Sequence, residues 1–266
     1  MCAKFNRAVF NLIPKSSFKE RLRGLYYSAY YNIKHFSENG FRVYYSNGHY
    51  EFKFEDGVEF KCYDNISDEL KRSLPGYLAK RALMQGDIVI DCGAYIGEFT
   101  LYAAKAVGDD GKVVAFEPDP IAYNRLCDNV KLNNLTNVIS VNKGVWSSNC
   151  NIRFINDRAG GNTFFPEKDN IKATNIPVVS IDGYLCGQKI EKADFIKMDI
   201  EGAELEALKG AAQTLRDNDV FLSIASYHVI NGRKACFDVE RMLKGLGYKA
   251  ETLHPCHLTT CAQKGD

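Results

Sequence analysis

From residue 87 onward, short apolar runs alternate with segments of helical periodicity. Five runs have the length and β-branched content of buried strands, and they lie at 88–90, 112–117, 138–141, 194–199 and 220–224. Segments with apolar residues at helical spacing lie at about 119–133, 202–216 and 236–247. The last strand-like pieces, 248–253 and 258–263, are suited to a closing hairpin. This alternation predicts an α/β fold, with a mostly parallel sheet and helices on both faces.

The chain before this region follows another pattern. Residues 16–36 repeat apolar and aromatic positions at helical spacing. The alternating segments 50–54 and 58–62 are joined through Asp-Gly, which predicts a β-hairpin. We therefore expect an N-terminal helix and hairpin extension at 1–66 and a main domain at 67–266.

One stretch, 147–193, interrupts the strand and helix alternation. It contains two short strand-like pieces, at 151–155 and 177–181. Long excursions from the carboxyl edge of a parallel sheet commonly build substrate sites. We expect this stretch to contribute to the binding of a substrate.

The net charge of the chain is +1, which gives no general attraction to nucleic acid. The charges are unevenly placed, because residues 1–36 hold seven basic residues and one acidic residue. This arm has a net charge of +6, so the remainder carries −5. A basic arm can contact an acidic membrane surface or a partner, and a solvated helix face is the alternative.

The nine cysteines are scattered and include no Cys-x-x-Cys pair. This usage is typical of reduced thiols in the cytosol. The sequence has neither a secretory signal pattern nor an apolar run long enough to span a bilayer. These features favour a soluble, cytoplasmic protein.

A glycine-containing turn follows the first strand of the main domain. A dinucleotide site requires Gly-x-Gly-x-x-Gly, whereas here Gly93 and Gly97 flank Tyr95 at the middle position. A side chain there should crowd a pyrophosphate, so the turn suits an adenosine ligand without a diphosphate. Asp91 precedes the turn, and Glu117 ends the second strand, where a carboxylate can accept both hydroxyls of a ribose.

Three segments together carry a family resemblance: Asp91–Gly97, Phe116–Pro120 and Ile196–Glu204. They resemble the successive motifs of the FkbM-type S-adenosylmethionine-dependent methyltransferases. The resemblance implies a Rossmann-like class I methyltransferase sheet of seven strands, the last two antiparallel. It also implies S-adenosyl-L-methionine as the cofactor and methyl transfer to oxygen, often on a sugar or natural-product hydroxyl. The acceptor is therefore expected to be a small molecule or a glycan.

The resemblance also implies which residues bind the cofactor: Asp91, Gly93, Ala94, Tyr95, Gly97, Glu117, Val145 and Asp199. The turn from Gly93 to Gly97 would enclose the methionine part, and Glu117 would hold the ribose. Val145 would lie near the adenine. Asp199, at the end of the fourth strand, would face the methionine end or the acceptor.

An alcohol acceptor benefits from a base that removes its proton. Four candidates follow strands four and five: Asp199, Glu201, Glu204 and His228. His228 is the preferred base because its ordinary pKa lies near neutral pH, and a loop-capping histidine is the alternative. Glu201 would orient the acceptor or favour the start of the next helix. Glu204 is expected on the helix surface or as a capping partner.

No metal site is expected. Asp199 and Glu201 could bind a divalent cation, but the loop after strand five offers no acidic partner. His254, His257 and Cys261 match no common zinc spacing.

Three other functions agree less well with the sequence than methyl transfer does. An NAD-dependent oxidoreductase conflicts with Tyr95, and a catalytically inactive methyltransferase-like scaffold conflicts with the complete set of strand-end residues. Nucleic-acid methylation has no support, because the core is mildly acidic and no Asn/Asp-Pro-Pro-Tyr/Phe motif follows strand four.

Overall fold

The computed structural model describes residues 17–34, 40–157, 161–163, 173–230, 232–253 and 257–265. Two compact units divide the chain, one up to Lys71 and one from Arg72 onward. Residues 1–16 and 35–36 of the basic arm lie outside the described residues, as do His254 and Cys256. None of the described helices has the length and apolar content needed to cross a membrane.

The first unit combines one helix with a small antiparallel sheet of order β1-β2-β3. Its elements are α2 (Ser17–Lys34), β1 (Phe41–Ser46), β2 (His49–Phe54) and β3 (Glu59–Cys62). Strands β2 and β3 form the predicted hairpin, whereas β1 was not predicted. The two-residue turn Asn47-Gly48 joins β1 to β2 with positive φ at both residues. Such a turn matches the twist of a hairpin.

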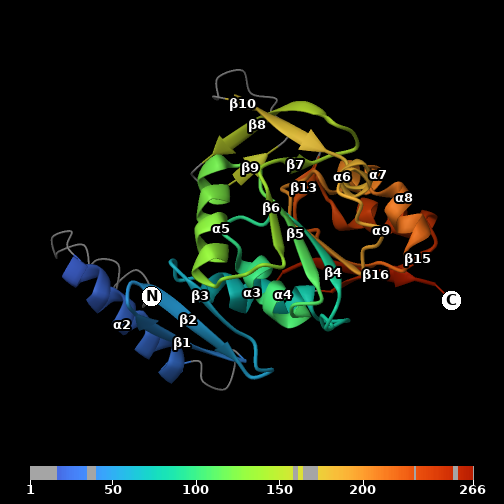
Figure 1. Cartoon of the computed structure of the whole chain (residues 1–266). Helices are drawn as coiled ribbons and strands as arrows, with labels where there is room; N and C mark the ends of the chain where they lie inside the picture. The colour runs from blue at the N-terminus through green and yellow to red at the C-terminus, as the bar shows by residue number, and fades with distance from the viewer. Residues whose placement is uncertain are drawn as a thin grey trace. The chain divides into compact units, whose positions relative to one another are not determined.

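The second unit is built on a seven-stranded sheet of order β15-β16-β12-β11-β4-β5-β6 (Figure 1). In chain order the strands are β4 (Ile88–Cys92), β5 (Lys112–Phe116), β6 (Val138–Val141), β11 (Phe195–Met198), β12 (Phe221–Ala225), β15 (Tyr248–Leu253) and β16 (Thr259–Lys264). The predicted α/β sheet is therefore confirmed. The last two strands are antiparallel to each other, and because β16 is also antiparallel to β12, only β16 is reversed in the sheet.

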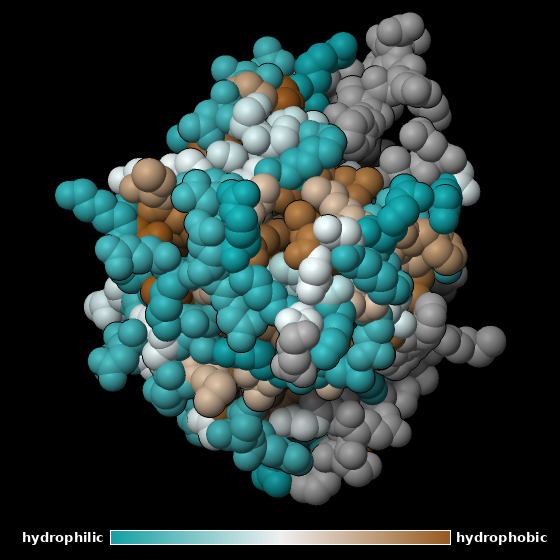
Figure 2. All heavy atoms as spheres, turned by 90° about the vertical axis from the view of Figure 1, so that its right-hand side faces the viewer, coloured by the Kyte–Doolittle hydropathy of each residue, from teal (hydrophilic) through white to brown (hydrophobic). Residues whose placement is uncertain are grey.

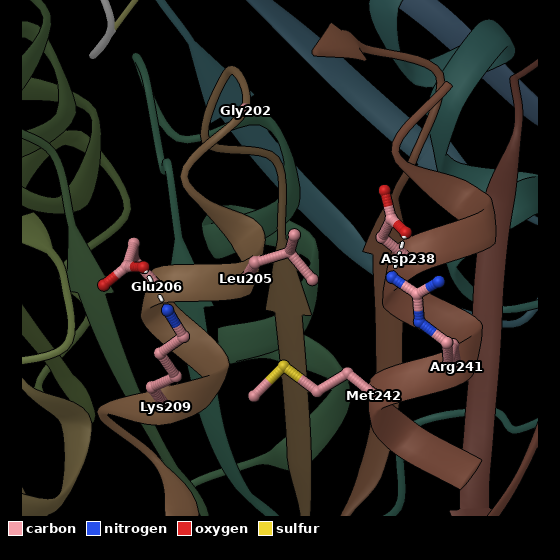
Figure 3. Close-up of a pocket in the computed structure, with 7 residues that line it drawn as sticks. All are labelled: Gly202, Leu205, Glu206, Lys209, Asp238, Arg241 and Met242. Carbon is pink, nitrogen blue, oxygen red and sulfur yellow. Dashed lines mark hydrogen bonds and ion pairs between the residues drawn. The ribbon is translucent and has the colours of Figure 1, made fainter. Parts of the chain in front are cut away.

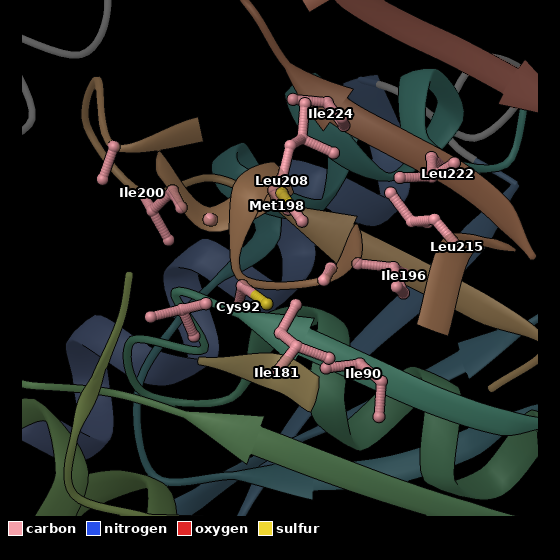
Figure 4. Close-up of a cluster of buried hydrophobic side chains, with 14 of the residues drawn as sticks. Ile90, Cys92, Ile181, Ile196, Met198, Ile200, Leu208, Leu215, Leu222 and Ile224 are labelled. Atoms are coloured by element: carbon pink, nitrogen blue, oxygen red, sulfur yellow. The ribbon is translucent and has the colours of Figure 1, made fainter. Parts of the chain in front are cut away.

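The central strands β4, β5, β11 and β12 are almost entirely buried, because helices pack on both faces of the sheet. Alternate residues such as Ile90, Ile196 and Leu222 join a core cluster with Leu208 and residues of the neighbouring helices (Figure 4). On the opposite face, the ring of Phe195 stacks on Phe99. The helices of this unit are α3 (Ser67–Tyr77, which spans the boundary), α4 (Glu98–Val107), α5 (Pro120–Leu132), α6 (Ile181–Gly187), α7 (Glu204–Lys209), α8 (Ala212–Asp217) and α9 (Cys236–Gly245).

The helix predicted at 202–216 is divided into α7 and α8. Gly210 lies in the break, and a Cβ atom there would lie 2.1 Å from the backbone oxygen of Trp146. The Asp182 carboxylate accepts hydrogen bonds from the N–H groups of Gln213 and Thr214, at the start of α8. The close contact with the Trp146 backbone and the cap from Asp182 therefore divide the predicted helix into two short ones.

The excursion 147–193 contributes to a second, four-stranded sheet of order β7-β10-β8-β9. These strands are β7 (Gly144–Val145), β8 (Cys150–Asp157), β9 (Gly161–Thr163) and β10 (Ala173–Val179). The predicted pieces at 151–155 and 177–181 overlap β8 and β10. Residues 158–160 and 164–172 of the excursion lie outside the described residues.

Candidate active site

The glycine turn after β4 lies directly against the end of β11. Gly93 has a φ of 81°, and a Cβ atom there would lie 2.0 Å from the backbone oxygen of Asp199. Gly97 has a φ of 105°, and its Cβ atom would lie 2.9 Å from the Leu126 side chain. These glycines therefore allow close packing within the protein, in addition to any approach of a ligand.

Asp91 lies behind this turn and is completely buried. Its carboxylate accepts a hydrogen bond from Lys197 Nζ at 3.0 Å and another from Thr100 Oγ1 at 2.6 Å. Lys197 Nζ also donates to the Gly93 carbonyl oxygen at 2.7 Å. Asp91 was expected to contact the cofactor. In the structure it binds Lys197, whose ammonium group in turn holds the Gly93 carbonyl oxygen of the turn.

Lys197 is a site residue that the sequence reasoning missed. Burial lowers its pKa, but the charges of Asp91 and Asp199 outweigh this effect and raise it, so the ammonium group stays charged. The available signal was a single lysine in the otherwise apolar strand β11. A buried charge of this kind is retained only when it is paired.

Glu117 connects the turn to the end of β5. It is 6% exposed, and its carboxylate accepts hydrogen bonds from the N–H groups of Tyr95 and Asp119, both at 2.8 Å. Burial raises the pKa of Glu117 to about 7, although both backbone donors oppose this shift. The Tyr95 side chain is 53% exposed, whereas Ala94 is buried in the core.

Val145, which was expected near the adenine, has a buried side chain. It is 1% exposed and belongs to the hydrophobic core cluster. Its strand β7 pairs with β10, where Val145 lies opposite Val179. The Val145 side chain therefore packs in the core, and the expected position of Val145 near the adenine stays a prediction.

Asp199 follows β11 and is held by two tyrosines that the sequence reasoning also missed. Tyr77 donates a hydrogen bond to Asp199 Oδ2 at 2.8 Å, and Tyr227 donates to Oδ1 at 3.1 Å. Burial and the nearby Asp199 charge raise the pKa of both phenols, so both stay protonated donors. Tyr227 could have been identified beside His228, whereas Tyr77 lies 122 residues away from Asp199 in the chain.

His228 lies among three carboxylates. Its Nε2 atom is 3.3 Å from Glu201 Oε2 and 3.7 Å from Asp199 Oδ1, and its Nδ1 atom is 3.2 Å from Glu204 Oε1. Burial lowers the pKa of His228, but its contacts with Glu201 and Glu204 raise it to about 10. These contacts therefore shift the pKa of His228 away from the ordinary value on which its choice as the base rests.

The two glutamates beside His228 differ in exposure. Glu204 is completely buried, so the expected surface position is wrong, although it accepts a hydrogen bond from the Gly202 N–H near the start of α7. Glu201 has a 39% exposed side chain and a φ of 55°, which is unusual for a residue other than glycine. The described chain thus brings the three predicted residues Asp199, Glu201 and His228 together and adds Glu204.

A separate pocket of about 400 Å³ lies between α7 and α9 (Figure 3). Leu205 and Met242 provide apolar atoms, and the ion pairs Glu206–Lys209 and Asp238–Arg241 lie beside them. The face of the molecule that carries these helices is mainly hydrophilic, with apolar atoms in its hollows (Figure 2). Each ion pair closes within one helix. The pocket lining includes Gly202 and Leu205, which follow Glu201 and Glu204 directly in the chain.

Comparison with known proteins relates this geometry to one family. The family model described as the methyltransferase FkbM domain matches residues 91–250. Methyltransferase sdnD from Sordaria araneosa is 29% identical, over 48% of this chain and 61% of that protein. Hexuronic acid methyltransferase AglP from Haloferax volcanii is 30% identical, over 50% of this chain and 53% of that protein.

A solved structure supports the fold. The crystal structure of methyltransferase FkbM from Methylobacillus flagellatus KT matches with a TM-score of 0.53 and 21% identity, over 70% of this chain and 45% of that chain. The sequence matches with sdnD and AglP span 61% and 53% of those proteins. Because the family model covers more than half of this chain and the sheet has the class I methyltransferase form, the chain belongs to the FkbM methyltransferase domain family.

Proposed function

We propose that this protein transfers a methyl group from S-adenosyl-L-methionine to a hydroxyl group of a sugar, a glycan or a small natural product. One observation carries the proposal: the Glu117 carboxylate binds the backbone of the Gly93–Gly97 turn through the Tyr95 N–H. This contact joins the carboxyl ends of β4 and β5, the edge where open α/β sheets bind nucleotide-like ligands.

The residues at this edge fit the proposed cofactor. When bound, S-adenosyl-L-methionine supplies a methyl group on a positively charged sulfur. Each oxygen of Glu117 accepts one backbone hydrogen bond, which leaves acceptor capacity for the two ribose hydroxyls. The Gly93–Gly97 turn would enclose the methionine part, with Asp91 and Lys197 fixing its backbone from behind.

The same turn argues against NAD. Tyr95 stands at the position where a dinucleotide site requires glycine for the approach of the pyrophosphate. Its side chain is 53% exposed at positive φ, so it occupies the open side of the turn. This arrangement favours an adenosine ligand that carries no diphosphate.

The acceptor side would be formed by Asp199, Glu201 and His228. Positioning contributes much of the rate in a displacement with a good leaving group. All three side chains are candidates to receive the proton of the hydroxyl. The name of the AglP relative, a hexuronic acid methyltransferase, supports a sugar acceptor.

Titration calorimetry of the full chain with S-adenosyl-L-methionine and with NAD tests the cofactor half. We expect the first to bind and NAD not to bind. Glu117→Ala should weaken cofactor binding about tenfold or more, because hydrogen bonds to a charged group are worth about 1.5–3 kcal/mol. Glu251→Ala removes an exposed ion-pair partner of Lys80 and serves as the matched control. Binding of NAD without binding of S-adenosyl-L-methionine would contradict the proposal.

A further inference from the structure

We propose that Asp199, Glu201 and His228 form a binding site for one divalent first-row transition-metal ion, of the Mn²⁺, Co²⁺ or Zn²⁺ class. The sequence pattern argued against a metal, because the loop after strand five offers no acidic partner to Asp199 and Glu201. In the fold, His228 supplies a ligand from this loop, opposite two carboxylates from the loop after β11.

The ligand atoms have a suitable separation. One ligand atom from each of the three side chains can be chosen so that all lie within 4.8 Å of one another. His228 Nε2 is 3.3 Å from Glu201 Oε2 and 3.7 Å from Asp199 Oδ1. Metal bonds to nitrogen and oxygen of about 2.0–2.2 Å place neighbouring ligand atoms about 3.0–3.5 Å apart. Small side-chain adjustments would therefore complete a site.

A second observation concerns His228 itself. Its side chain is 10% exposed, and both ring nitrogens are buried without a hydrogen bond to any part of the chain that the structure describes. The nearby carboxylate oxygens lie 3.2–3.7 Å from these nitrogens, at ion-pair distance, and none of them is a hydrogen-bond partner. Buried polar atoms normally have such a partner, so Nε2 points to a ligand between His228 and the two carboxylates.

The surrounding residues have the arrangement that metal sites use to orient their ligands. Glu204 is completely buried and places Oε1 3.2 Å from Nδ1 of His228, the nitrogen that faces away from Asp199 and Glu201. A metal-bound histidine characteristically directs its other ring nitrogen to a carboxylate. Tyr77 and Tyr227 hold the Asp199 carboxylate in place with their hydroxyl groups.

The donor set selects the class of ion. Mg²⁺ and Ca²⁺ prefer sites made only of oxygen, whereas one imidazole with two carboxylates suits Mn²⁺, Co²⁺ or Zn²⁺. Three protein ligands leave coordination positions of the ion open. One of these positions would hold the acceptor hydroxyl, and this part of the inference rests on the proposed function. The binding of the ion itself does not depend on that function.

The test uses the full chain after removal of metals with a chelator, with Co²⁺ as the probe. We expect one Co²⁺ ion per chain, detected by calorimetry and by its visible absorption spectrum. His228→Gln and Glu201→Gln should each weaken binding at least about tenfold, and Glu204→Gln should weaken it about 10–100-fold as an orienting residue. Glu206→Gln, on the same short helix as Glu204, is the control and should bind Co²⁺ as the unmodified chain does.

Binding of S-adenosyl-L-methionine is measured on the same samples, so that loss of the fold and failure of the proposed function are recognised separately. Glu201 is partly exposed, which makes its variant informative if the His228 variant does not fold. The inference is overturned if the unmodified chain binds no Co²⁺, if Mg²⁺ displaces Co²⁺ at equal concentration, or if Glu201→Gln binds Co²⁺ as tightly as the control.

Discussion

At the scale of single residues, the ion pairs and hydrogen bonds of the charged side chains at the strand ends determine which of these side chains can reach a ligand. Glu117 and Asp199 were predicted from their positions at strand ends, and both lie at the carboxyl edge of the sheet. Asp91 was predicted by the same logic but is enclosed, because its partner Lys197 comes from 106 residues later in the chain. Pattern reasoning identifies which residues reach the edge, whereas pairing across the sheet decides which of them a ligand can meet.

The raised pKa of Glu117 gives a prediction for folding stability. The group has a pKa of about 7 in the folded protein, against an ordinary value of 4.5, so its ionised form is less favourable in the folded state. Its contribution to the free energy of unfolding is therefore unaffected well below pH 4.5 and falls as pH rises toward 7 and slightly above. Between pH 5 and pH 8 this decrease should be about 2 kcal/mol.

Urea unfolding of the unmodified chain and of Glu117→Gln at pH 5 and pH 8 checks this effect. The difference in free energy of unfolding, unmodified minus variant, should be smaller at pH 8 than at pH 5. Comparing differences removes the constant cost of the backbone hydrogen bond that glutamine cannot accept. A difference that is independent of pH would mean that Glu117 titrates normally in the folded protein.

At the scale of elements, the turn after β4 depends on close packing against the end of β11. Gly93→Ala should lower the free energy of unfolding by at least about 2 kcal/mol more than Gly86→Ala does. Both glycines have positive φ, which costs alanine about 1 kcal/mol. Only the Cβ atom at 93 would meet backbone, because nothing lies within 4 Å of the one at 86. Denaturant unfolding measures both values, and equal losses would refute the packing role of Gly93.

Sequence patterns predicted most elements of the main sheet but missed features that depend on distant contacts. The break between α7 and α8 requires the backbone of Trp146 at Gly210, which no periodicity within 202–216 reveals. Strand β1 does have a local signal in the sequence: the Asn47-Gly48 dipeptide that follows it strongly favours a hairpin turn. Tyr77 reaches Asp199 from α3 and gave no signal at all.

At the scale of the whole molecule, the family match and the division of the chain into units agree on where the methyltransferase domain lies. The match covers 91–250, which falls entirely within the unit from Arg72 onward. We propose that the predicted domain at 67–266 carries the transferase function, with 1–66 as an accessory extension. The contact of the basic arm with a membrane surface stays a prediction, since residues 1–16 lie outside the described residues.

The most direct test of the central claim is a methyl-transfer assay with the full chain. Labelled S-adenosyl-L-methionine is incubated with the protein and a panel of sugars, uronic-acid glycans and cell extract, and the products are analysed by mass spectrometry. The proposed methyltransferase function predicts a product that carries one added methyl group on a hydroxyl oxygen, and the Glu117→Ala variant should form much less of this product. Folded protein that binds the cofactor yet labels no hydroxyl compound in any of these samples would contradict it.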